Sequence, residues 1–198
     1  MGASGTNMRF CTKCTHGFSE GAFTTMKGRS MAKSKVILVN DLMQSGYQYE
    51  LTAPAGQQFE AGFEPHYAPG EMLELGVFEG KYLNDCREEF PASWFQNAKL
   101  SQKADASVNH FGIKSRQPLK VWREKGWIIS PDPRGWFQWY CRYYMGRRLD
   151  TIDQMQIKRW RGFSRHARQV QLNCDPADIF CRPRQRQALL QWAYDPFI

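Results

Sequence analysis

The sequence lacks long apolar runs. No stretch approaches the roughly 18 to 20 consecutive apolar residues that a membrane-spanning helix needs. The hydrophobic segment 36–39 is also far too short to be the core of a secretory signal peptide. The sequence therefore predicts no membrane span and a cytoplasmic protein.

The chain also lacks the familiar signatures of catalysis and nucleotide binding. It contains no phosphate-binding GxxxxGK[ST] loop, no Rossmann fingerprint, no GxSxG elbow and no HExxH zinc motif. No helix-turn-helix, zinc-finger or RNP pattern is present, and no internal repeat occurs. From these absences we expect no resident cofactor and no sequence-specific reading of bases. The sequence identifies no catalytic residue.

Acidic residues are scarce in the last third of the chain. Residues 114–198 carry seventeen Lys and Arg against seven Asp and Glu, whereas residues 46–113 carry four against ten, and residues 1–45 six against two. If the acidic middle folds against the basic end, some arginines will pair with its carboxylates, namely Glu71, Glu74, Glu79, Asp85, Glu88 and Glu89. The rest of the net charge of +8 remains for a partner.

Six cysteines occur in the chain without any secretory signal, and reduced thiols are the simplest expectation for them. Cys11, Cys14 and His16 have the spacing of half a zinc site, because thiolates and imidazole are preferred zinc ligands. The second half of such a site is missing. Cys174 and Cys181 are separated by six residues, which is wider than usual for a zinc pair.

Aromatic residues are abundant and concentrated. Five of the seven tryptophans lie between Trp122 and Trp160, interspersed with arginines. Burying one indole removes roughly 200 Å² from water and contributes about 5 kcal/mol, whereas stacking on one nucleobase contributes about 1 to 3 kcal/mol. We therefore expect most of these rings to fill the core and one or two to form exposed platforms.

Periodicity predicts a mainly helical fold. Residues 1–45 form a flexible basic extension, although Lys35 to Asn40 is strand-like, and residues 46–198 form a single helical domain with a short irregular or two-stranded lead-in. Within this domain an aromatic helix follows Pro133 and stops at Gly146, and the longest helix begins at Asp150 and runs to about Leu172. A last helix begins at Pro183.

Basic residues recur on one face of the longest predicted helix, at spacings of three and four. Together with the arginines that precede it, this face is the candidate nucleic-acid-binding site, and a solvated helix face is the alternative. Six phosphate contacts would give a salt slope near −5 on duplex DNA. The candidate residues are Arg142, Arg147, Arg148, Lys158, Arg161, Arg165 and Arg168.

The region from about Tyr47 to Asp195 resembles a family of conserved hypothetical proteins found in bacteria, phages and some eukaryotes. Four strings carry the resemblance: EMLELGVF (71–78), KGWI (125–128), DPRGWFQWYCRYY (132–144) and RQRQALL (184–190). The family has no established activity, so the resemblance implies neither a ligand nor a catalytic residue. It implies that residues 1–45 lie outside the shared domain.

Three functions fit these patterns. The first is binding of nucleic acid or another polyanion, without sequence specificity, through backbone contacts of the C-terminal arginines. The second is a small enzyme that acts on a nucleotide or nucleobase in a cleft between the acidic middle and the arginine-rich end, where Asp85, Cys86, Glu88, Glu89 and His166 are the groups to watch. The third is an interaction module for an acidic protein.

Overall fold

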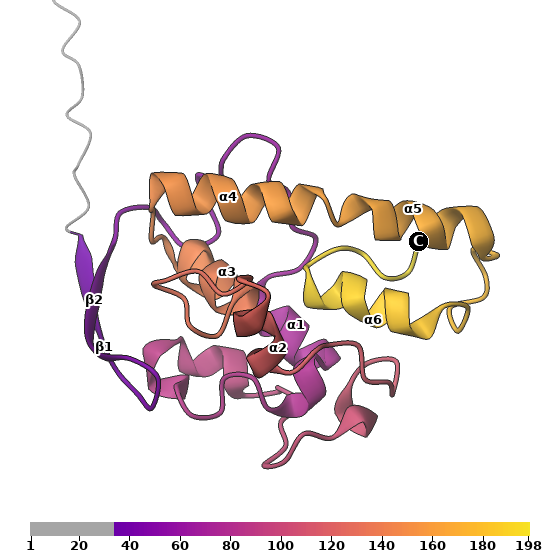
Figure 1. Ribbon diagram of the computed structural model, residues 1–198, viewed down its shortest axis with the longest axis horizontal. Helices are drawn as coiled ribbons and strands as arrows, with labels where there is room; N and C mark the ends of the chain where they lie inside the picture. The colour runs from indigo at the N-terminus through magenta and orange to yellow at the C-terminus, as the bar shows by residue number, and fades with distance from the viewer. Residues whose placement is uncertain (1–33) are drawn as a thin grey trace, which may run out of the picture. The chain divides into compact units, whose positions relative to one another are not determined.

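The structure is a computed structural model that describes residues 34–198, and it begins with a β-hairpin. Strands β1 (Lys35–Asn40) and β2 (Ser45–Leu51) pair antiparallel (Figure 1). Because β1 pairs along its whole length with β2, the folded part begins before residue 46, and the prediction that the extension reaches residue 45 is wrong. The rest of the predicted extension, residues 1–33, lies outside the described residues.

Helices are the main regular secondary structure after the hairpin, as the sequence predicts. Short 3-10 segments connect them across the acidic middle of the chain, at Phe78–Gly80, Arg87–Glu89, Ala92–Phe95 and Ala106–Val108. The α-helices are α1 (Pro69–Leu75), α2 (Leu119–Glu124), α3 (Trp136–Met145), α4 (Asp150–Arg161), α5 (Ser164–Asn173) and α6 (Pro183–Gln191).

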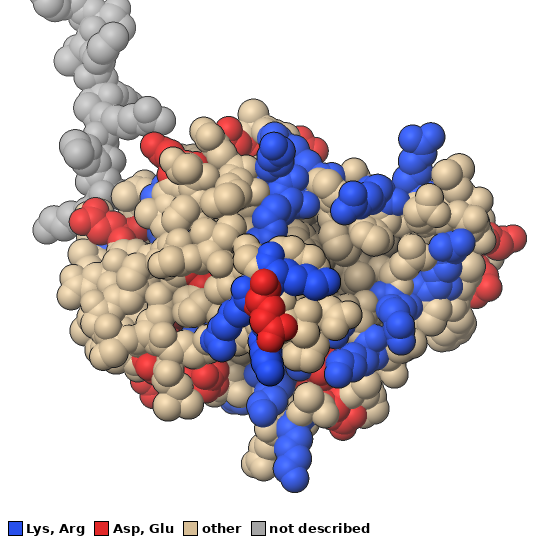
Figure 2. All heavy atoms as spheres, in the orientation of Figure 1, with Lys and Arg blue, Asp and Glu red and all other residues tan. Residues whose placement is uncertain are grey.

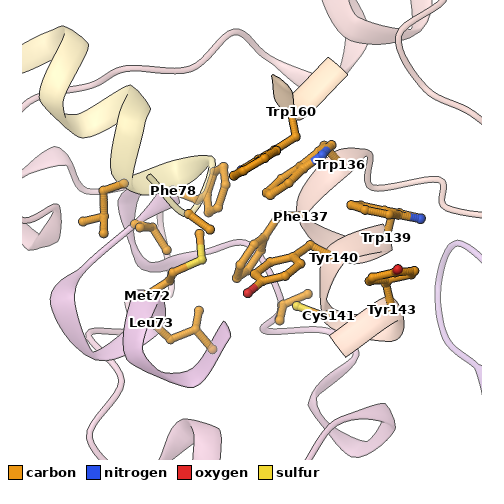
Figure 3. Packing of buried hydrophobic residues seen from close by; sticks show 14 of the residues in the cluster. Met72, Leu73, Phe78, Trp136, Phe137, Trp139, Tyr140, Cys141, Tyr143 and Trp160 are labelled. Atoms are coloured by element: carbon orange, nitrogen blue, oxygen red, sulfur yellow. The ribbon is translucent and has the colours of Figure 1, made fainter. Parts of the chain in front are cut away.

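Helix α3 is the centre of the fold. Every one of its residues except Tyr144 is buried, so its rings pack on all sides, against α1, against the loop around Phe63 and against Trp160 of α4 (Figure 3). Phe63 meets Trp139 and Trp160 edge-on, at ring-centroid distances of 5.6 and 4.9 Å. A helix that is buried on nearly all sides is stable only when other elements enclose it, and here they do.

Gly146 ends α3 and joins it to the segment after β2. Its backbone is left-handed, with φ of 113°, and its carbonyl accepts hydrogen bonds from the N–H groups of Thr52 and Ala53 at 2.9 and 3.1 Å. A Cβ atom at this position would lie 1.9 Å from the Ala53 carbonyl oxygen. Only glycine satisfies both the backbone conformation and this close approach.

The predicted long helix from Asp150 to Leu172 is two helices. Helix α4 ends at Arg161 and α5 begins at Ser164, and the two follow one another along one edge of the structure (Figure 1). The interruption coincides with Gly162, which has low helix propensity. Helix α6 packs beside α5, and Cys174 and Cys181 form a disulfide in the loop that connects the two helices.

The expectation of six reduced thiols is therefore wrong for Cys174 and Cys181. Their Cα atoms lie 5.7 Å apart, because the loop between α5 and α6 turns back on itself. Cys86 and Cys141 are free and buried, as the simplest reading of the sequence predicts. Cys11, Cys14 and His16 lie outside the described residues. Among residues 34–198, no helix has the length and apolar character required to cross a bilayer.

Buried charges connect α3 to the hairpin and the acidic middle. Arg142 on α3 binds both carboxylate oxygens of Glu89 and also Asp132, at 3.0 Å. Arg147 binds both oxygens of the same Asp132, at 2.9 and 2.7 Å. We call the following residues the buried ion network: Asp41, Glu89, Asp132, Arg134, Arg142 and Arg147.

Tyrosines of β2 complete the network. Tyr49 donates a hydrogen bond to Glu89 at 3.0 Å, and the rings of Tyr47 and Tyr49 lie 5.1 and 5.4 Å from the Arg142 guanidinium carbon. Burial by itself would lower the pKa of Arg142, but the hydrogen bond and attraction from Glu89 outweigh it and raise the pKa. Arg142 therefore stays charged inside the protein.

The acidic middle does pair with the basic end, as the charge distribution suggests. Arg134 bridges Asp41 and Asp85 at 3.0 and 2.8 Å, and Arg116 binds Glu79 at 2.7 Å. Burial favours the neutral form of Asp41, yet Arg134 and two backbone N–H groups lower its pKa overall. Of the six carboxylates expected to neutralise arginines, Glu79, Asp85 and Glu89 do so.

Replacing Arg142 by methionine is expected to destabilise the protein by about 3 to 5 kcal/mol, because Glu89 and Asp132 would be left buried with fewer positive partners. The matched control is Arg165→Met on the exposed face of α5, which is expected to change stability by no more than about 0.5 kcal/mol. Urea unfolding followed by circular dichroism measures both. Equal effects of the two substitutions would show that the network does not support the fold.

Candidate functional site

Two of the seven predicted nucleic-acid-binding residues are in the protein interior. Arg142 and Arg147 are 0% and 1% exposed and belong to the buried ion network. The prediction that they contact a polyanion is wrong. The physical reason is that both guanidinium groups are paired with Glu89 or Asp132 in the interior, and that no phosphate can reach them without disrupting the core.

Two further predicted residues bind the protein's own backbone. Arg148 is half-buried, donates to the carbonyl oxygens of Gln57 and Gln58 at 2.8 and 3.1 Å, and lies 4.0 Å from the centre of the Tyr143 ring. Arg161 is exposed but donates to the carbonyl of Gly62 at 3.3 Å. Several N–H groups of these two arginines are therefore occupied by the protein's own carbonyl oxygens.

Lys158, Arg165 and Arg168 remain available. All three are exposed, and among the described residues none forms a salt bridge with a carboxylate. Figure 2 shows lysine and arginine side chains spread across the middle and right of the face on which α4, α5 and α6 lie in Figure 1, with acidic side chains much sparser among them. We call Lys158, Arg161, Arg165 and Arg168 the basic ridge.

A cleft of about 510 Å³ lies beside the basic ridge. The volume is within the range of small-ligand sites. The segments around Phe78 and Ser115 form part of its wall, and the start of α3, the α4–α5 junction and α6 form the rest. We call it the aromatic cleft, because eight Phe, Tyr and Trp rings line it: Phe78, Tyr82, Trp122, Trp127, Trp136, Phe137, Phe163 and Trp192.

Some rings of the aromatic cleft stack on one another, and one is exposed to solvent. Trp192 lies between Trp136 and Phe163, at centroid distances of 4.7 and 4.8 Å and interplanar angles of 27° and 9°. His166 continues the series at 4.4 Å from Phe163. Trp127 is 43% exposed and is the single exposed tryptophan among the described residues. The stacked rings are structural, whereas Trp127 offers a surface to solvent.

Arg159 brings an uncompensated charge to the aromatic cleft. It is half-buried and donates to the Trp127 carbonyl and to Gln156, each at 2.9 Å, but among the described residues it has no carboxylate partner. Burial lowers its pKa. The neighbouring His166 has a pKa lowered by burial and by Arg165, so its imidazole is neutral near pH 7. A partly desolvated guanidinium of this kind favours an anionic ligand.

Several buried polar atoms around the aromatic cleft lack hydrogen-bond partners. They include the hydroxyl of Tyr82, Nε of Arg116 and one carboxylate oxygen of Glu79, the residue that pairs with Arg116. The Tyr82 hydroxyl lies near the backbone N–H of Gln138 without reaching hydrogen-bond geometry. Unpaired buried polar atoms are uncommon in proteins, and a bound water, ion or ligand is one explanation for them.

The acid and thiol groups considered for catalysis lie elsewhere. Asp85, Cys86, Glu88 and Glu89 line a separate hollow of about 650 Å³ beside β1. One ligand atom from each of Asp41, Cys86 and Glu89 lies within 4.8 Å of the others. Both carboxylates are bound to arginines, and burial raises the pKa of Cys86 to about 12, so this group is poorly suited to bind a cation. His166 alone of the candidate catalytic groups lines the aromatic cleft.

Sequence reasoning missed most of the aromatic cleft. Arg159, Phe163 and His166 recur at spacings of four and three, which places them on one helix face next to the basic ridge. That spacing could have been noticed. The contributions of Tyr82 and Arg116 could not, because long loops bring them to the cleft.

Comparisons of the chain with protein-family models, with curated proteins and with solved structures found no match. The resemblance to a conserved hypothetical family consequently stays a prediction.

The unpartnered hydroxyl of Tyr82 leads to a stability prediction. Tyr82→Phe is expected to leave stability unchanged or to increase it by up to about 1 kcal/mol, because it removes a buried group that has no hydrogen bond. Tyr140→Phe is the matched control: the Tyr140 hydroxyl donates to the Tyr67 carbonyl at 2.7 Å, so its loss is expected to cost about 1 kcal/mol. Thermal unfolding measures both. A larger loss for Tyr82→Phe than for Tyr140→Phe would contradict the assignment.

Proposed function

We propose that this protein binds nucleic acid without sequence specificity, through contacts of the basic ridge with the phosphate backbone. The observation that carries the proposal is that Lys158, Arg165 and Arg168 are exposed and have no carboxylate partner among the described residues. By contrast, Arg134, Arg142 and Arg147 are already paired with carboxylates inside the fold. Cations left without such partners favour an external polyanion.

The spacing of the ridge suits a repeating anion. Lys158 and Arg168 are ten residues apart on two helices that follow one another, which corresponds to roughly 15 Å at 1.5 Å per residue. Duplex DNA carries one charge per about 1.7 Å of its axis, so a backbone presents phosphates along this whole length. The contacts are made to phosphates alone, so they provide affinity and orientation but no reading of sequence.

A small enzyme that acts on a nucleotide or nucleobase is the second candidate, and the position of the aromatic cleft favours it. The cleft lies between the acidic middle, which contributes Phe78 and Tyr82, and the arginine-rich helices α4 and α5. The buried Glu79–Arg116 pair adjoins it. Incubation with nucleoside mono- and triphosphates, followed by chromatography, tests this candidate, and release of a product that depends on Glu79 would favour it.

An acidic protein partner is the third candidate. It would bind the same cations, but it would not account for the aromatic rings of the cleft.

Binding is expected to fall steeply with salt. Four ridge cations predict a slope of log K against log salt of about −3 on single strands and nearer −4 on duplex, so affinity should drop roughly 50- to 150-fold between about 50 and 200 mM salt. Neutralising Arg165 or Arg168 with glutamine should reduce the slope by about 1 each. Fluorescence anisotropy with labelled oligonucleotides measures these slopes.

Lys35→Gln is the matched control for these substitutions. Lys35 is an exposed cation on β1, at the opposite side of the described structure from α5 (Figure 1), so its loss removes the same charge outside the ridge. The slope should be nearly unchanged. Absence of any binding at about 50 mM salt, or equal effects of Lys35 and Arg165, would contradict the proposal.

A further inference from the structure

We infer that the aromatic cleft accepts one unstacked nucleobase, and that the nucleic acid bound by this protein is therefore single-stranded. This inference rests on the proposed function and names its substrate class. The inference depends on the residues that line the aromatic cleft, whereas the proposed function depends on the basic ridge. One experiment can therefore contradict either of them without contradicting the other.

The first argument is the free aromatic surface. Trp127 is 43% exposed at the cleft, and the half-buried Trp122 lies on the same wall, where its ring packs beside Gly135. Lys125 lies 4.9 Å from the centre of the Trp127 ring and holds a positive charge over it. Exposing an indole to water is unfavourable, and stacking a planar base on it recovers about 1 to 3 kcal/mol.

The second argument is the polar complement of the cleft. Tyr82 and Arg116 line the cleft, and the Tyr82 hydroxyl and Nε of Arg116 are buried donors without partners. A nucleobase presents carbonyl and ring-nitrogen acceptors along its edges, and it reaches these two donors once the side chains shift toward the cleft. Arg159 and Arg165 supply positive charge at the same cleft, and every base in a strand is accompanied by a phosphate. The cleft thus combines a planar apolar surface, unpartnered donors and uncompensated cations.

These features exclude other occupants of similar size. A purely apolar ligand would leave Arg159 desolvated and without an anion, which is costly. Inorganic phosphate would satisfy the cations but leave Trp122 and Trp127 without a contact. A paired base inside a duplex has both faces covered by its neighbours, so it cannot enter a cleft without being extruded, which costs a few kcal/mol. A single strand supplies a planar base for the tryptophans, acceptors for the donors and a phosphate for the cations, and its bases need not be extruded from a duplex.

The decisive test compares two single strands that carry the same phosphates. We would measure anisotropy with a labelled thymidylate oligomer of about 12 nucleotides and with an abasic oligomer of equal length, using the full chain at about 50 mM salt. The wild-type protein should bind the thymidylate roughly 5- to 150-fold more tightly than the abasic strand. This comparison needs no substitution and is therefore independent of any effect on folding.

Substitutions then test whether the preference for the thymidylate strand arises from the aromatic cleft. Trp127→Ala should abolish most of the preference for the thymidylate strand, while Phe180→Ala, which removes an exposed ring (76% exposed) outside the cleft, should preserve it. Arg168→Gln should weaken both strands equally and leave their ratio unchanged. Circular dichroism confirms that each variant is folded.

The outcomes separate the two proposals. Equal affinity for the thymidylate and abasic strands, with the salt dependence intact, would overturn the inference about the cleft and leave the phosphate-binding function in place. A preference that survives in Trp127→Ala and is lost in Phe180→Ala would also overturn it. Failure of both strands to bind would overturn the proposed function itself.

Discussion

The bidentate pair between Arg142 and Glu89 is the interaction on which the structure depends. It joins the central helix α3 to the acidic middle of the chain, and Asp132 extends it to Arg147. Desolvating two charges costs several kcal/mol each, and only complete pairing offsets that cost. The tyrosines of β2 and the side chain of Gln44 complete the pairing, so the hairpin is fixed to α3 by the same charges.

This network also decides which cations can meet a partner. The basic end of the chain contains far more Lys and Arg than acids, but these cations differ in role. Arg134, Arg142 and Arg147 stabilise the interior, and Lys158, Arg165 and Arg168 remain on the surface beside the aromatic cleft. Net charge alone would overstate the number of phosphate contacts, because four arginines of the basic region are paired with carboxylates: Arg116, Arg134, Arg142 and Arg147.

The sequence was sufficient to predict the elements whose signals are local. Gly146 marks the end of α3 and Pro183 the start of α6, and both boundaries are confirmed. Of the five tryptophans between Trp122 and Trp160, three are buried, as expected: Trp136, Trp139 and Trp160. The interruption between α4 and α5 was missed, because a single glycine within a continuous pattern does not by itself end a helix. The folded part begins earlier than predicted because β1 pairs with β2. The sequence pattern indicated the strand at Lys35 to Asn40, but it did not show which segment pairs with it.

The site was less predictable, because burial is a property of the tertiary structure. Arg147 and Arg148 are adjacent in sequence, yet one is enclosed with Asp132 and the other lies across the ring of Tyr143. Nothing in the local pattern distinguishes them.

NMR titration of the arginine side-chain Nε–H signals with a single-stranded oligonucleotide tests most directly which arginines are buried and which contact the ligand. The account predicts shifts at Arg159, Arg165 and Arg168 and none at Arg142 and Arg147, and shifts confined to the buried pair would contradict it.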